Sequence, residues 1–259
     1  MQPVAWIVWA SCAGMVAFGT TNPFYLGVVV AASWVVHAAH RRPGPGARSF
    51  AIFLRFAVLA VVVRTGLAMF GTLSPSSVAY AALEGARLGT ILVVFGTFNA
   101  VTDPYGVLRL APRRFHEPAL AATLALSIAP RTISAAARVR EAQELRGIRL
   151  RRFRSLPALA VPVLETGMEE AVTLAESMDA RGHGRGRRTR YRPQPWTAAS
   201  VAVSLVGVAV VAVYLAAGWA GRGDLNPSTF PLAWPEVSLG LVFAAAALAL
   251  PSLIREEPR

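Results

Sequence analysis

Two short stretches of this sequence, Glu141-Ala142-Gln143-Glu144-Leu145-Arg146-Gly147 and Glu176-Ser177-Met178-Asp179-Ala180-Arg181-Gly182, share one pattern. Each is the end of a run with helical composition, and each is closed by an arginine and a glycine. Glycine adopts the left-handed backbone conformation that ends many helices, because it lacks a Cβ atom. We therefore predict two helices that stop at Gly147 and Gly182, each with an arginine projecting from its tip.

A single Arg-Gly pair is usually a solvated helix end, because a cation near a helix C-terminus also interacts favourably with the helix dipole. Here the pattern recurs after 35 residues, inside a segment, 138–192, that holds 13 of the 26 arginines of the chain. A guanidinium group presents five donors in one plane, which matches carboxylates well. Two such tips are therefore suited to acidic grooves on a partner protein.

The composition is that of a polytopic membrane protein. The chain has 259 residues, of which 54% are hydrophobic, and several apolar runs approach the roughly 20 residues that cross a bilayer. The net charge of +12 comes from arginine alone. In a soluble chain it would suggest nucleic-acid binding, whereas here the excess of positive charge in cytoplasmic loops explains most of it. Residues 1–20 lack a basic segment and a cleavage site, so we expect a retained span.

Hydropathy and charge predict an all-α fold with about six transmembrane helices and both termini in the cytoplasm. The basic loop 41–48 contains no acidic residue and is placed in the cytoplasm, whereas the uncharged segment 72–83 is placed outside. The expected spans are about Pro3–Gly19, Phe24–His40, Ser49–Gly71, Glu84–Thr102, Thr197–Trp219 and Trp234–Ile254, with a turn at Thr20–Pro23.

The apolar segment 118–137 is predicted not to cross. Pro130 and Arg131 interrupt it and leave only 12 uncharged residues before them, and a crossing would place the seven arginines of 138–154 outside. The chain is thus expected to have a membrane part of four spans (1–104), a cytoplasmic coupling domain of long amphipathic helices (105–192) and a membrane part of two spans (193–259).

Within the cytoplasmic part, 155–162 is expected to be a linker, because it holds two prolines. Val163–Ala180 is expected to be an amphipathic helix whose apolar stripe packs against the other long helix. The arginine- and glycine-rich tract 183–192 is expected to lie against anionic lipid headgroups. The stripe consists of Leu164, Met168, Ala171, Val172, Ala175 and Met178.

The sequence carries little chemistry of its own. It has no glycine-rich phosphate loop, no G-x-S-x-G, no H-E-x-x-H and no metal-ligand spacing around its single Cys12 or its four histidines. Charged residues inside spans are usually paired or functional, and we predict that Arg64 and Glu84 form a structural pair rather than a transport pathway. We expect a protein that is not an enzyme and binds no cofactor or metal.

Several motifs together resemble one known family, the transmembrane (T) component of energy-coupling-factor transporters, which includes the CbiQ-type cobalt transporter subunit. The resemblance covers most of the chain. In that family two short Ala-Arg-Gly motifs end long cytoplasmic coupling helices; the second is complete here, whereas Leu145 replaces alanine in the first. The motifs that carry the resemblance are Thr102-Asp103-Pro104, Ile128-Ala129-Pro130, Glu141-Ala142-Gln143-x-x-Arg146-Gly147, Leu174–Gly182 and Arg188-Thr189.

This resemblance implies a non-catalytic subunit of an ATP-driven importer in the cell inner membrane. Two cytoplasmic ABC ATPases, which bind the ATP, would each receive one tip. A separate S component would bind the vitamin or transition-metal substrate. The implied ATPase-binding residues are Leu145, Arg146, Gly147, Ala180, Arg181 and Gly182.

Two other readings stay open. One is a membrane-anchored protein that binds nucleic acid or anionic lipid through the tract 181–192, although Tyr191 is its only aromatic residue and base stacking is poorly supported. The other is a membrane enzyme, which the missing acid, base and metal-binding motifs disfavour. We therefore expect membrane lipid, but no nucleic acid, among the partners.

Overall fold

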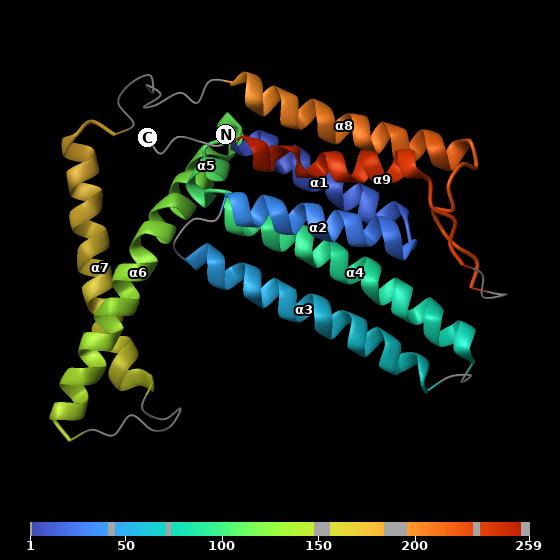
Figure 1. Cartoon of the computed structure of the whole chain (residues 1–259). Coiled ribbons are helices and arrows are strands. Elements are labelled where there is room, and N and C mark those ends of the chain that lie inside the picture. The colour runs from blue at the N-terminus through green and yellow to red at the C-terminus, as the bar shows by residue number, and fades with distance from the viewer. Residues whose placement is uncertain are drawn as a thin grey trace. The chain divides into compact units, whose positions relative to one another are not determined.

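All regular structure is helical in the part of the chain that the computed structural model describes, namely residues 2–40, 45–70, 74–147, 156–183, 196–229 and 234–254 (Figure 1). The predicted all-α fold is thereby confirmed. In chain order the elements are α1 (Pro3–Gly19), α2 (Pro23–Ala39), α3 (Pro45–Ala68), α4 (Pro75–Val101), α5 (Pro104–Leu108), the 3-10 turn η1 (Arg113–Phe115), α6 (His116–Leu145), α7 (Leu156–Ala180), α8 (Ala198–Trp219), α9 (Leu239–Ala246) and the 3-10 helix η3 (Ala247–Leu253).

The chain divides into two compact units. The first, which we call the bundle unit, comprises Met1–Val107 and Gln194–Arg259; the second, the two-helix unit, comprises Leu108–Pro193. Among the described residues, four helices are long and apolar enough to cross a membrane: Ser49–Ala68 within α3, α4, α6 and α8. The apolar helices α1, α2 and Leu239–Leu253 are shorter. The molecule is a polytopic, all-α membrane protein.

The interior of the bundle unit forms where α1 and α2 pack against α4, α8, α9 and η3. Trp9, which is 1% exposed, donates from its indole nitrogen to the carbonyl of Leu248 at 2.9 Å. Tyr214 donates to the carbonyl of Leu241 at 3.1 Å. Both aromatic rings thus bury their apolar bodies without leaving a polar atom unsatisfied.

Helix α3 packs closely against α4, because α4 presents glycines to it. A Cβ atom on Gly85 would lie 2.9 Å from the Cα of Val61, and one on Gly96 would lie 2.7 Å from the Cβ of Phe53. Small residues let membrane helices approach until their backbones touch. The four-residue spacing of Gly85 and Gly89 is a sequence signal for this contact that the hydropathy analysis did not use.

The turn between α1 and α2 also fastens the loop that follows α8. The buried side chain of Asn22 accepts a hydrogen bond from the Phe24 N–H at 3.1 Å and so starts α2. The same side chain donates to the carbonyls of Asp224 at 2.7 Å and Glu236 at 3.2 Å. The predicted break at Thr20–Pro23 is confirmed, and its asparagine holds distant parts of the sequence together.

The structure corrects the predicted start of the fourth span. We expected a loop through residue 83 and a helix from about Glu84, but α4 begins at Pro75. The Ser74 hydroxyl accepts from the Ser77 N–H at 3.2 Å, and the Ser77 hydroxyl accepts from the Ser74 N–H at 3.2 Å. This reciprocal cap, with proline in the first turn, is a helix start and not a loop.

Prolines misled the prediction at two other places, and the start of the last helix also differs. The expected linker 155–162 is wrong from residue 156 onward, because α7 begins at Leu156 and continues through Pro162. Helix α6 runs without a break for 30 residues through Pro130 and is long and apolar enough to span a membrane. Pro130 therefore does not interrupt it, and only charge still argues against a crossing. The last span begins at Leu239 instead of Trp234, and Pro251 lies in its 3-10 part.

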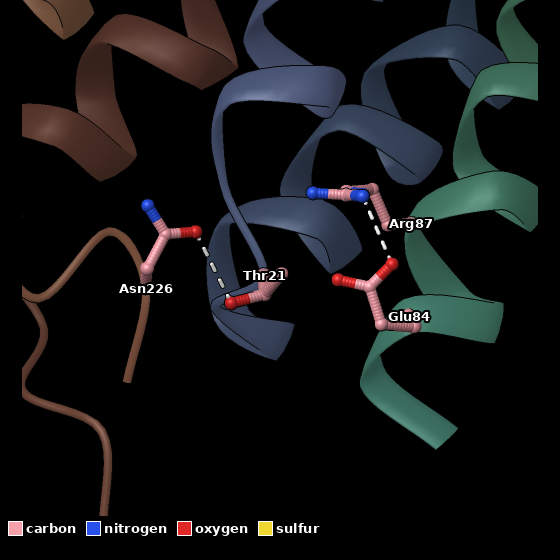
Figure 2. Close-up of polar contacts among 4 residues, drawn as sticks. All are labelled: Thr21, Glu84, Arg87 and Asn226. Atoms are coloured by element: carbon pink, nitrogen blue, oxygen red, sulfur yellow. Dashed lines mark hydrogen bonds and ion pairs between the residues drawn. The ribbon is translucent and has the colours of Figure 1, made fainter. Parts of the chain in front are cut away.

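The predicted pair of Arg64 and Glu84 is also wrong. Glu84 accepts a hydrogen bond from Arg87, one turn later in α4, at 2.9 Å (Figure 2). The guanidinium of Arg87 also lies over the ring of Phe18, 5.2 Å from its centroid. Residues three apart in one helix are already neighbours, so this pair forms without any alignment between helices.

Candidate partner-binding helix tips

The first tip is the C-terminal end of α6. After Leu145, the Arg146 N–H donates to the carbonyl of Ala142 at 3.2 Å and the Gly147 N–H donates to that of Glu144 at 3.0 Å. Gly147 has a φ of +80°, and a Cβ atom at this position would meet no atom within 4 Å. Its backbone conformation, not a lack of space, is therefore the reason for glycine.

The second tip, at the end of α7, has the same geometry. The Gly182 N–H donates to the carbonyl of Asp179 at 2.8 Å, and the His183 N–H donates to that of Met178 at 3.0 Å. Gly182 has a φ of +77°, and the space where a Cβ atom would lie is open. These two bonds are the pattern of the Schellman motif, which satisfies the last carbonyls of a helix.

Both tips are accessible. Leu145 is 85% exposed, and Arg146, Ala180 and Arg181 are exposed as well. Among the described residues, neither Arg146 nor Arg181 forms an ion pair within the chain. By contrast, Arg140 on the same helix as the first tip pairs with Glu144 at 3.0 Å. The two tip arginines are thus presented outward, with their hydrogen-bonding capacity available to another molecule.

The helices that carry the tips pack against one another but enclose no core. In the described part of the two-helix unit, no residue is classed as buried. The apolar stripe of α7, which we expected to pack against the other long helix, is exposed instead: Leu164 by 65%, Met168 by 70% and Val172 by 58%. The half-buried side of α7 includes Val163, Leu174 and Ser177. The stripe prediction is wrong because α7 turns a neighbouring face toward α6.

The exposed side of α7 presents a patch of mixed apolar and acidic side chains. It is formed by Met168, Glu169, Val172, Thr173 and Glu176. Apolar and acidic side chains therefore alternate on a surface that the rest of the unit leaves open. The glutamates are evident in the sequence. Whether they and the apolar stripe are both exposed depends on how α7 is rotated against α6, and helical spacing alone does not determine this rotation.

No arrangement typical of metal chemistry occurs at these tips or elsewhere in the described residues. No three side chains among histidine, cysteine, aspartate and glutamate come together there in a way that could hold a metal ion. The basic tract beyond His183 begins at residue 184, outside the described residues, so the predicted lipid contact of that tract stays a prediction.

Comparison with known proteins points to one kind of membrane protein. No family model matches the chain. It is 30% identical over 125 residues to the energy-coupling factor transporter transmembrane protein EcfT of Exiguobacterium sibiricum, which is 45% of this chain and 46% of that protein. It is 32% identical over 111 residues to EcfT of Bacillus subtilis, covering 39% of this chain and 42% of that protein.

A third EcfT, from Thermotoga maritima, is 28% identical over 169 residues, which is 58% of this chain and 62% of that protein. The chain thus matches about half the length of these curated relatives. The family resemblance that the paired Arg-Gly motifs indicated is confirmed: in sequence, this membrane protein is similar to the EcfT transmembrane proteins of energy-coupling factor transporters.

Proposed function

We propose that this chain is the transmembrane coupling subunit of an importer of the energy-coupling factor type. In this role it transmits the movement of two ABC ATPases to a membrane-embedded S component, which binds a vitamin or a transition-metal ion. The chain itself catalyses no reaction and binds no cofactor. The observation that carries the proposal is the pair of exposed arginines, Arg146 and Arg181, each fixed at a helix end by a glycine with positive φ.

The tips support docking to the ATPases through their chemistry. At each tip the backbone N–H groups of the arginine and the glycine donate to carbonyls of the preceding turn, so the guanidinium group is not needed for these bonds and can bind a carboxylate on the partner. Two contacts made by one subunit also reinforce one another, since the first raises the effective concentration of the second. One tip for each ATPase accounts for the repetition of the motif.

The absence of a buried core in the described two-helix unit supports movement. Packed interiors resist small displacements, whereas helices that share only half-buried contacts can shift against one another at lower cost. The exposed stripe of α7 gives such helices an apolar surface for a membrane partner. We propose that ATPase closure shifts α6 and α7 and that this surface passes the movement to the S component.

The test is copurification of the ATPases with Arg146→Ala, Arg181→Ala and the double variant, with ATP-driven uptake measured in parallel. Loss of one arginine should weaken ATPase binding by about 2–5 kcal/mol, because a carboxylate is left unpaired in the interface. Arginine to lysine should rescue only partly, since lysine lacks the planar fork. The double variant should release both ATPases.

Arg140→Ala is the matched control on α6. This arginine is exposed and pairs with Glu144 of its own helix, so its removal should leave ATPase binding nearly unchanged. Size-exclusion chromatography in detergent verifies that every variant is folded. A double variant that still retains both ATPases and still transports would refute the role assigned to the two arginines.

A further inference from the structure

The exposed face of α3 carries one charge among apolar side chains. Helix α3 packs against α4, and Arg55 lies on an exposed face of α3. Its neighbours at helical spacing are apolar and exposed by 49–60%: Ile52, Val58, Leu59 and Val62. The surrounding segment Ser49–Ala68 has a mean hydropathy of 2.0 and is long enough to span a membrane, so we expect this face to contact lipid. A charge in such a place is costly unless it is neutralised.

In the described part of the chain, Arg55 has no counter-charge. No ion pair forms with it there. The sequence contains no acidic residue before Glu84, and Glu84 is paired with Arg87. Arg64, the other arginine of α3, lies nine residues away and therefore on the opposite side of the helix, where it is adjacent to Gly85 of α4. We therefore look for the partner of Arg55 outside the chain.

Helix geometry indicates where that partner lies. Side chains of an α-helix lean toward its N-terminus, and Arg55 stands six residues, or about 9 Å, after Ser49. A long arginine stem can cover much of this distance and bring its charge to the polar edge of the membrane. At that edge Asn99 donates to the Ser49 hydroxyl at 3.0 Å on the exposed surface. The segment just before Ser49 contains three arginines, Arg41, Arg42 and Arg48, and no acidic residue.

We propose that Arg55 binds the phosphate group of an anionic phospholipid whose acyl chains lie along the apolar face of α3. The phosphate supplies the counter-charge that Arg55 does not find among the described residues, and the lipid tails cover the four exposed apolar residues. A protein helix with a carboxylate could also neutralise Arg55. The lipid fits better, because the side chain leans toward the basic end of α3, where anionic headgroups gather.

The proposal is tested with the full-length protein in bilayers that mix phosphatidylglycerol with phosphatidylcholine. After extraction, native mass spectrometry compares the two lipids that stay bound. The wild type should retain phosphatidylglycerol selectively, and Arg55→Gln should retain about fivefold less, as expected for loss of about 1 kcal/mol per arginine. Arg55→Lys keeps the positive charge, so this variant should retain most of the phosphatidylglycerol that the wild type retains. Arg222→Gln removes an equal charge from the exposed loop after α8 and should behave as the wild type.

Two results would overturn the proposal. One is equal retention of phosphatidylglycerol by the wild type and Arg55→Gln while both are folded by size-exclusion chromatography. The other is unchanged lipid retention together with loss of a copurifying membrane protein in Arg55→Gln, which would make this face a protein interface. Neither result depends on ATPase binding, so failure of this proposal would leave the proposed coupling function untouched, and the reverse also holds.

Discussion

At the scale of single residues, the two tip glycines are the positions where backbone conformation decides the identity of the side chain. Gly147 and Gly182 have positive φ and empty surroundings. The sequence was sufficient to predict both, because an arginine and a glycine after a helical run form a local signal. The pairing of Glu84 with Arg87, three residues later in the same helix, is a local signal too, but we expected Arg64 of α3 as the partner instead.

Replacing Gly182 with alanine should therefore damage the second tip without disturbing the bundle unit. A non-glycine residue in the left-handed region costs about 1–2 kcal/mol, so the last turn of α7 should rearrange and present Arg181 poorly. We expect ATPase copurification to fall severalfold while the thermal stability of the membrane part stays unchanged.

Gly167→Ala is the matched control for this substitution. Gly167 lies inside α7, lacks a positive φ and has no atom within 4 Å of the position that a Cβ would take, so alanine should be neutral or slightly stabilising. If Gly182→Ala and Gly167→Ala retain the ATPases equally well, the conformation of Gly182 does not matter for docking.

At the scale of helices, a helix lies in each of the six expected spans, but several ends differ, and three of these helices are shorter than the span candidates α3, α4, α6 and α8 of the described residues. Hydropathy marks the apolar runs, whereas the ends of the helices depend on side-chain caps and on whether a proline is accommodated inside the helix. Ser74 and Pro75 start α4 through a side-chain cap, and the prolines of α6 and α7 are accommodated inside continuous helices. The rotation of α7 against α6 was also beyond the sequence, because both faces of α7 contain apolar residues and only tertiary packing selects one.

Because α6 is continuous, the most informative question about the helices is whether α6 crosses the membrane. By length and composition it could cross the membrane, yet a crossing would carry the arginines of 138–154 outside, against the charge bias. We predict that Leu145→Cys, in a chain whose buried Cys12 is replaced by alanine, is not labelled by a membrane-impermeant maleimide in intact cells. In cells that express this chain without the ATPases, it should be labelled once the cells are opened.

Phe70→Cys, in the same background, supplies the positive control, because this side chain is 90% exposed at the end of α3, next to the segment predicted to be outside, and its side does not depend on α6. Labelling of both positions in intact cells would show that α6 crosses the membrane. The cytoplasmic placement of residues 105–192 would then be wrong.

At the scale of the whole molecule, the chain combines a well-packed bundle unit with a two-helix unit that has no buried residue in its described part. Burial of apolar surface supplies most folding free energy, so a helix pair without a core gains stability from what it binds. Its exposed stripe, the glutamates beside that stripe and its two arginine tips fit a unit that binds other subunits of a larger assembly. The sequence revealed the tips and the family resemblance, whereas the missing core emerged only with the fold.

The most direct test of the central claim is site-specific photo-crosslinking in the assembled transporter. A photoreactive amino acid is placed at Leu145 or Ala180, next to each tip arginine, and at Leu205 on α8 as a control that is 64% exposed in the bundle unit. The account predicts ATPase adducts from Leu145 and from Ala180 and none from Leu205. An intact complex in which neither tip position crosslinks to an ATPase would contradict it.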